Sequence, residues 1–284
     1  MRGDTGVITD VAAAAARHGS SNINTMLIIG IVLIVASGVG FYFMRNAQKR
    51  LHAMIGTETL TIPQLEEARK ISDELGNRGG FRKVAEVVGA AHPRPQGVLT
   101  AEISKTECVW YRYQVERQYE DVEYNNGNRR TVKRTETVAE QTSFDGYALI
   151  DEAGRTIGVD PNGTNPDGVE QTVSRFEQAQ NNQGQVEMFG IKLPNFFNNN
   201  GGTIGFEYKE WVIRPGRRLY VLGEVHDKIG PLVIAKPQDG PFIISNRTEE
   251  ELRSSATKQH NLFRIGVLAA FAIGVVLTVL GIVN

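Results

Sequence analysis

Two uncharged apolar stretches, MLIIGIVLIVASGVGFYF at residues 26–43 and IGVLAAFAIGVVLTVLGIV at residues 265–283, decide how this chain is organised. Each is close to the ~20 apolar residues with which an α-helix crosses the ~30 Å hydrocarbon core of a bilayer. Neither has the polar stripe that a core helix of a soluble protein carries on its outer side. The sequence therefore predicts a two-pass membrane protein whose one folded domain is tethered to the bilayer at both ends.

Basic residues near the ends of the two stretches predict the orientation. The first stretch gives a weak indication, because its two ends differ by a single positive charge. The second gives a stronger one, because nothing basic follows it and four basic residues precede it: Arg247, Arg253, Lys258 and Arg264. By the positive-inside rule the central domain faces the cytoplasm, and the protein is a multi-pass protein of the plasma membrane.

The polar part of the chain divides into helical and β segments. Thr61 and Gln64 have the spacing of a capping box around Pro63, and Gly76 ends the helix that they begin. Thr248 and the glutamates after it predict a second helix start that continues into residues 265–283. The predicted segments are a tail (1–25), a transmembrane helix (26–43), a juxtamembrane helical segment (44–80), a β domain (81–246), a juxtamembrane helix (247–264) and a second transmembrane helix (265–283).

Apolar residues alternate with polar ones over most of residues 81–246, which is typical of strands with one buried face. Cys108 to Glu116 is the clearest example, with Tyr111 and Tyr113 on one face. Residues 97–103 also read as a strand, whereas residues 160–202 read as long loops with a short helix near Ser174 to Gln180. About nine strands without crossover helices predict a mainly antiparallel β domain, a barrel or a sandwich, with an OB-like barrel among the alternatives.

Composition argues against several kinds of function. A net charge of −1 does not favour nucleic-acid binding. With one cysteine, Cys108, and five scattered histidines, the chain has no zinc-ligand pattern, and it contains no phosphate-binding or dinucleotide-binding glycine motif. Cys108 reads as a buried strand residue, and the Asp160-Pro161-Asn162-Gly163 run reads as a turn rather than a calcium loop. We therefore expect no catalytic residues, no metal ligands and no cofactor.

Two basic clusters are candidate contacts for an acidic partner or for anionic lipid headgroups. Acidic residues lie close to the first cluster in sequence, so a self-paired, solvated hairpin is the competing interpretation. The first cluster is Arg129, Arg130, Lys133 and Arg134, and the second is Arg214, Arg217 and Arg218.

Small residues in the two apolar stretches are candidates for close packing, either of the two helices or of two copies of the chain. The spacing of four residues that suggests this is found at Gly266, Ala270 and Gly274 in the second stretch and at Ala36 and Gly40 in the first.

An ordered set of short motifs over roughly residues 50–283 resembles one family, the GIDE or beside-a-membrane (BAM) domain. That domain is the membrane-bracketed module of Mulan-type ubiquitin ligases of mitochondria and plant organelles, and this chain looks most like its bacterial members. The motifs are Glu86-Val87-Val88-Gly89, Cys108-Val109-Trp110-Tyr111-Arg112, Leu149-Ile150-Asp151 with Gly154, Ile213-Arg214-Pro215-Gly216 with Leu219-Tyr220-Val221-Leu222-Gly223, and Phe242-Ile243-Ile244-Ser245 with Thr248-Glu249.

The resemblance implies a ubiquitin-ligase family, but this sequence departs from that pattern. The eukaryotic ligases carry a zinc-binding RING finger after the second span, and one cysteine cannot supply its ligands here. In the mitochondrial relative the domain faces the intermembrane space, which disagrees with the orientation that the charges predict.

We therefore expect a non-enzymatic scaffold or sensor at the lipid bilayer. Its expected partner is a membrane or cytoplasmic protein or lipid headgroups, not a nucleic acid, and the two helices are candidates for self-association. The alternatives are a ubiquitin-pathway role by resemblance only, and an enzyme with a site assembled from distant residues, of which Cys108 and Asp151 would be the first candidates.

Overall fold

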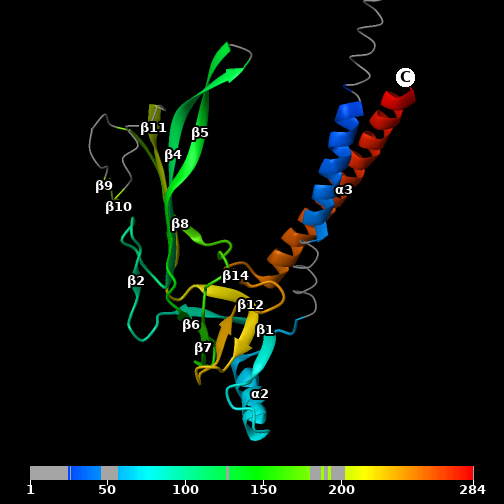
Figure 1. The fold of residues 1–284 in the computed structure, drawn as a ribbon. Helices are drawn as coiled ribbons and strands as arrows, with labels where there is room; N and C mark the ends of the chain where they lie inside the picture. Colours follow the sequence, from blue (N-terminus) through cyan, green and yellow to red (C-terminus); the bar gives the residue numbers. More distant parts are fainter. Residues whose placement is uncertain are drawn as a thin grey trace, which may run out of the picture. The chain divides into compact units, whose positions relative to one another are not determined.

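The computed structural model describes residues 25, 27–45, 57–125, 128–179, 187–188, 191–192 and 202–283. They belong to two units. One contains two apolar helices, and the other, Thr57–Glu249, is mainly β (Figure 1). The predicted fold class is confirmed: apolar helices near both termini flank a largely antiparallel β domain.

Five strands of the β domain close into a barrel. The hydrogen-bonded order is β1-β6-β7-β13-β12, and β12 pairs back to β1 along its length. All of these pairs are antiparallel except β7–β13. Numbered along the chain, the order is 1-2-3-5-4-1 with strands 3 and 5 parallel, which is the arrangement of an OB-type Greek-key barrel. The barrel strands are β1 (Arg82–His92), β6 (Tyr147–Ile150), β7 (Thr156–Val159), β12 (Arg218–His226) and β13 (Val233–Ala235), and β14 (Ile243–Ser245) pairs with β12 beside β13.

Two insertions into this barrel build a second sheet of four strands, in the order β5-β4-β11-β8. The first insertion lies between β1 and β6 and the second between β7 and β12. In Figure 1 the β4–β5 hairpin extends beyond the other strands of this sheet. The inserted strands are β2 (Leu99–Thr100), β3 (Glu107–Cys108), β4 (Trp110–Asn125), β5 (Asn128–Thr142), β8 (Glu170–Gln178), β9 (Glu187–Met188), β10 (Ile191–Lys192) and β11 (Gly202–Ile213).

The helix α2 (Ile62–Glu74) packs on the barrel core through its first turns. Its N-terminus has the predicted capping box, in which the backbone N–H of Thr61 donates to Gln64 Oε1 at 2.8 Å. The predicted stop is also confirmed, because Gly76 adopts a φ of 87°, which residues with a side chain rarely adopt. Ile62 and Leu65 are fully buried and belong to the barrel's hydrophobic cluster.

Leu65 gives a direct test of how strongly α2 holds the barrel core. We expect Leu65→Ala to destabilise the domain by about 2–4 kcal/mol, because it removes a fully buried side chain and leaves a cavity. Leu75→Ala is the matched control, since Leu75 ends the same helix with 81% of its surface exposed, and it should change stability by less than about 0.5 kcal/mol. Urea unfolding of the whole protein in detergent, followed by tryptophan fluorescence, measures both. Equal midpoints for the two variants would contradict the packing described here.

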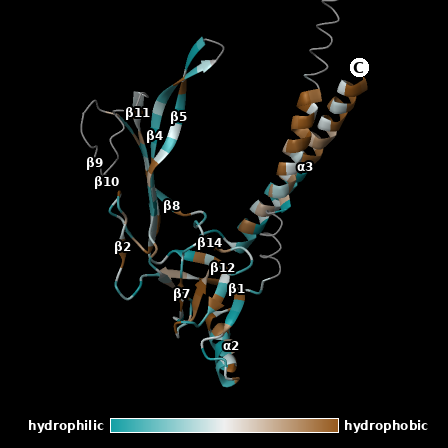
Figure 2. Ribbon diagram, in the orientation of Figure 1, coloured by the Kyte–Doolittle hydropathy of each residue, from teal (hydrophilic) through white to brown (hydrophobic). Residues whose placement is uncertain are grey.

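The chain's C-terminal helix, α3 (Glu249–Val283), is continuous over 35 residues, as the glutamates after Thr248 predict. Both α3 and the helix Leu27–Arg45 are long and apolar enough to cross a membrane, by length and composition. Figure 2 shows hydrophobic residues along the helix Leu27–Arg45 and the C-terminal part of α3. The predicted tail (1–25) lies almost wholly outside the described residues, as does the chain between 45 and 57.

Two predictions about the inserted segments are wrong. The short helix expected near Ser174 to Gln180 falls on the strand β8, which pairs with β11. The strand expected over residues 97–103 is reduced to β2, because a tight turn follows at once and places Lys105 at a φ of 57°.

Candidate functional site

A groove of about 650 Å³ lies beside β1 in the β domain. Its walls come from the chain segment Thr59–Pro63, which leads into α2, and from the β6–β7 turn at Ile150–Ala153. Its floor is Val88, Gly89 and Ala90 of β1. A Cβ at position 89 would lie 2.8 Å from the carbonyl O of Ile150, so glycine is required for the end of β6 to pass this close to β1. Most of the lining is apolar, with Arg218 at the rim.

A buried carboxylate fixes one wall of the groove. Glu86 is fully buried on β1 and accepts hydrogen bonds from Tyr220 Oη at 2.6 Å and Thr59 Oγ1 at 2.9 Å. The main chain adds to this attachment, since Leu60 N–H donates to the carbonyl O of Glu86 at 2.9 Å. The groove wall that leads into α2 is therefore held on the barrel by both side-chain and main-chain bonds.

The basic turn after β11 is largely neutralised by carboxylates. Arg214 donates two hydrogen bonds to Glu170, each 2.8 Å long, and this guanidinium lowers the pKa of the Glu170 carboxyl. Arg218 lies 3.6 Å from Glu152 on the exposed surface. Arg217 uses its main chain in the turn, accepting a bond from Ala91 N–H at 2.8 Å. The three predicted contact residues of this cluster share one turn, but at least two of their charges are paired within the chain.

The basic residues of the β4–β5 hairpin also face acidic ones. Arg130 lies opposite Glu123 and Lys133 opposite Glu120 in the strand register, while Arg129 lies opposite Tyr124. Arg134 forms ion pairs with Asp121, at 2.8 Å, and with Glu123. Opposite charges across antiparallel strands stabilise the ribbon by a few tenths of a kcal/mol per pair, up to about 1 kcal/mol. The arrangement matches the self-paired hairpin that was the competing interpretation of this cluster.

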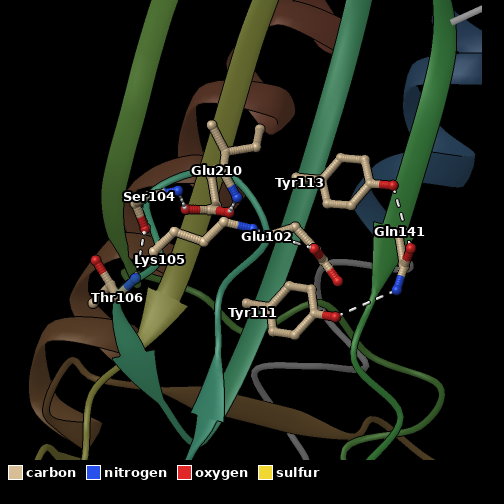
Figure 3. Close-up of polar contacts among 9 residues, drawn as sticks. Glu102, Ser104, Lys105, Thr106, Tyr111, Tyr113, Gln141 and Glu210 are labelled. Carbon is tan, nitrogen blue, oxygen red and sulfur yellow. Dashed lines mark hydrogen bonds and ion pairs between the residues drawn. The ribbon is translucent and has the colours of Figure 1, made fainter. Parts of the chain in front are cut away.

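A second buried carboxylate organises the turn between β2 and β3. Glu210 of β11 is fully buried and accepts bonds from the backbone N–H groups of Ile103, at 2.6 Å, and Ser104, at 2.9 Å. Thr172 Oγ1 adds a third bond at 3.1 Å. Figure 3 shows this carboxylate beside Ser104 and Lys105. No local motif in the sequence signals the contact, because Glu210 and Ile103 are far apart in the chain.

Two tyrosines on the same sheet form hydrogen bonds to one side-chain amide, that of Gln141. Tyr113 Oη donates to Gln141 Oε1 at 3.2 Å, and Gln141 Nε2 donates to Tyr111 Oη at 3.3 Å (Figure 3). Burial raises the pKa of both phenols, so both stay protonated at neutral pH. The three side chains form a hydrogen-bond network between β4 and β5.

Cys108 lies in the hydrophobic cluster of the second sheet and is fully buried. Burial, with the nearby Glu210 as a smaller cause, raises the pKa of its thiol to about 12. At pH 8 this thiol is therefore almost entirely protonated, and the thiolate is the reactive form. Asp151 is also engaged, because its carboxylate accepts the N–H groups of Ala153 and Arg155 in its own turn.

We expect the native protein to resist maleimide at Cys108. The matched control is Gln96→Cys, which puts a thiol on the exposed turn between Arg94 and Gly97. At pH 8 the introduced thiol should react at least 100-fold faster than Cys108, and both should react alike after unfolding. Mass spectrometry of the labelled protein measures the two rates, and rapid native labelling of Cys108 would contradict its burial.

The two apolar helices lie antiparallel, and several of their glycines lie at the contact between them. A Cβ on Gly274 would lie 3.0 Å from the carbonyl O of Gly30, and one on Gly40 would lie 2.8 Å from Val267 Cγ2. Ala270 is half-buried, whereas Ala36 is exposed and a Cβ on Gly266 would meet nothing within 4 Å. The four-residue spacing thus missed Gly30, Ser37 and Gly281, all of which are buried. The informative signal was a spacing of seven, in Gly30/Ser37 and Gly274/Gly281.

Within the described part of the chain, no three His, Cys, Asp or Glu side chains form a group that could hold a metal ion. The Asp160 turn bonds internally, since Asn162 N–H donates to Asp160 Oδ1 at 3.0 Å.

Comparison with known proteins identifies the family. No curated protein and no solved structure matches the chain. The family model described as "GIDE: E3 Ubiquitin ligase" matches residues 116–281, which include most of the second sheet, the later barrel strands and nearly all of α3. The match covers more than half of the 284 residues, and the chain therefore belongs to the GIDE family.

Proposed function

We propose that this protein is a membrane-anchored interaction module whose β domain binds a protein partner and has no catalytic site of its own. The observation that carries the proposal is the apolar groove beside β1, in a domain flanked by two helices of membrane-spanning length. Anchoring at both ends would hold the domain at the bilayer and raise its effective concentration toward other membrane proteins. The charge distribution supports a cytoplasmic position at the plasma membrane.

The chemistry of the β domain favours binding over catalysis. Cys108 is buried and protonated, and Asp151 is occupied by its own turn. OB barrels usually bind nucleic acids on the face formed by their second and third strands, and the composition of that face here does not favour nucleic-acid binding. The residues that point outward there are Ala148, Ile150, Thr156 and Gly158 on β6 and β7, and they provide neither aromatic rings for stacking nor positive charges.

A protein partner is favoured over lipid headgroups because several cations of the two basic clusters form ion pairs with carboxylates. Arg134 of the first cluster pairs with Asp121, and Arg214 of the second pairs with Glu170. Headgroup binding by these residues would require those pairs to be broken, whereas the groove beside β1 offers apolar surface without that cost.

The family description supports a second candidate, a role in ubiquitin transfer. A single cysteine cannot provide the zinc ligands of a RING finger within these 284 residues, so a role in ubiquitin transfer would use chemistry that these residues do not supply. Purified protein incubated with ubiquitin, activating enzyme, a panel of conjugating enzymes and ATP tests this directly. We expect no ubiquitin chains, and chain formation would replace our proposal.

Sidedness is tested with Gln96→Cys and a membrane-impermeant maleimide. Intact cells should leave the introduced thiol unlabelled, and permeabilised cells should label it; extraction of the membranes with alkaline carbonate should leave the chain in the pellet. Labelling in intact cells would place the domain outside, and release by carbonate would remove the anchoring from the proposal.

Partner binding is tested by site-specific photocrosslinking of the full chain in its membrane. A photoreactive phenylalanine analogue replaces Glu152 at the groove rim, and in separate variants Lys133 on the β4–β5 hairpin or Gly266 on the outer side of α3. A discrete adduct to one identified protein, reproduced with the purified pair, supports an interaction module. Adducts only between copies of the chain at Gly266 would indicate self-association, and no adduct at any position would contradict the proposal.

A further inference from the structure

Main-chain pairing along the edge of β1 beside the groove is interrupted. Glu86 uses both of its main-chain groups on this edge, accepting from Leu60 N–H and donating to the carbonyl O of Glu58. Ala91 uses both of its groups on the opposite edge, with Arg217 and Gly216. Because these groups alternate between the two edges of a strand, Val88 and Ala90 present theirs on the same edge as Glu86.

Two segments pair with this edge of β1, one on each side of Val88, and both turn away from β1 before they reach it. The segment through Leu60 turns away into α2, and β6, which pairs with Ala90 at Ile150, turns away into the β6–β7 turn. Among the residues that the structure describes, none hydrogen-bonds to the N–H or C=O of Val88 on this edge. The distance along β1 from Glu86 to Ala90 is four residue steps, about 13 Å at the ~3.3 Å rise of a strand.

The chemistry of this opening selects a peptide main chain. One residue offers a donor and an acceptor side by side on a strand edge, and the complementary pair is the N–H and C=O of another extended chain. A saturated lipid tail has neither group. The half-buried side chain of Val88 and the surrounding Leu60, Ile150 and Ala153 add apolar surface for the side chains of such a peptide.

We infer that the groove receives a short extended segment of a partner protein, one residue of which pairs with Val88 as a strand. The walls limit the part of the segment that lies in the groove to about three or four residues, because α2 and the β6–β7 turn close the edge on either side. An apolar residue beside the pairing residue would contact Val88 and Leu60. The inference rests on the proposed function. It specifies the partner as an extended peptide segment and the contact as the main-chain N–H and C=O of Val88.

A peptide selected on the purified full chain tests the inference. The probe is a random heptapeptide library displayed on phage, panned on the protein in detergent micelles, and the winning sequence is then synthesised. Methylation of one backbone nitrogen of that peptide should reduce affinity at least 10-fold at a single position, and methylation elsewhere should have little effect. Peptide binding should also slow hydrogen exchange of the Val88 amide at least 10-fold.

The matched variants are Val88→Arg and Val84→Arg, the same substitution four residues apart on one strand. Val84 shares the orientation of Val88 but lies outside the groove, with 44% of its surface exposed. Val88→Arg should weaken peptide binding at least 10-fold and Val84→Arg less than twofold. If Val88→Arg fails to fold, hydrogen exchange of the Val88 amide and the affinities of the methylated peptides, both measured on the unaltered protein, still test the inference.

Two outcomes would overturn the inference: no selectable peptide, or a peptide whose binding leaves Val88 exchange unchanged. The crosslinking variants separate this failure from failure of the proposed function. A partner adduct from Lys133 with none from Glu152 would keep the interaction module and reject the groove, and no partner adduct from either would reject both.

Discussion

Gly274→Leu is expected to separate the two apolar helices. The Cβ alone would lie 3.0 Å from the carbonyl O of Gly30 and 3.2 Å from the N of Ile34. Backbone atoms of the other helix therefore occupy the space that a leucine side chain would need. Backbone cannot move aside as a flexible side chain can, and the helix axes must shift apart. Gly266→Leu is the matched control, because the same residue type on the same helix meets nothing within 4 Å.

Disulfide formation between Gly40→Cys and Val267→Cys reports on the helix pair. These positions are in contact in the native arrangement, and oxidation should join them readily in the otherwise unaltered chain. Adding Gly274→Leu should slow the reaction at least 10-fold, whereas Gly266→Leu should leave it unchanged. An unchanged rate with Gly274→Leu would show that the helices do not meet along this face.

Glu210→Gln is expected to cost about 2–3 kcal/mol of folding stability. The fully buried carboxylate accepts hydrogen bonds from Ile103 and Ser104 N–H and from Thr172 Oγ1. An amide of the same shape replaces one acceptor oxygen with a donor, which leaves a buried N–H facing another N–H. Glu207→Gln is the control: Glu207 is half-buried on the same strand, beside Lys209, and a change below about 0.5 kcal/mol is expected.

Urea unfolding gives the stability difference, and hydrogen exchange gives its location. The amides of Ile103 and Ser104 should exchange faster in Glu210→Gln than in the unaltered protein, while the barrel amides of β1 change less. If both substitutions cost the same, Glu210 would contribute no more than an ordinary surface carboxylate.

Local features were readable from the sequence because the physics that produces them is local. The capping box of Thr61 and Gln64 and the alternation around Tyr111 and Tyr113 both recur in the structure. The strand β8 was missed because it lies at an edge of its sheet, and most of its side chains are exposed on both faces. Without a buried face there is no alternation to detect, and its glutamines resembled a loop.

The parts of the site that matter most depend on contacts between distant residues. The interrupted edge at Val88 exists only because β6 and the segment before α2 both leave it, and neither segment predicts the other. The contact role of the basic clusters stays a prediction, and the strand register, which the sequence does not show, places carboxylates opposite Arg130 and Lys133. The four-residue spacing includes Gly40 and Gly274, which lie at the contact between the helices, but it also includes Gly266, which meets nothing within 4 Å, and it omits Gly30.

The pairing of β1 with β12 also constrains the order in which the molecule can fold. Arg82 pairs with His226 and Ala90 with Arg218, so the barrel is closed by strands from opposite ends of the domain. Contacts of such long sequence separation make folding slow, in the range of milliseconds to seconds. During synthesis β1 emerges long before β12, and the apolar side chains of β1 stay unpacked until β12 is available to pair with it. The β4–β5 hairpin, whose strands are adjacent in the chain, can form while the barrel is still open.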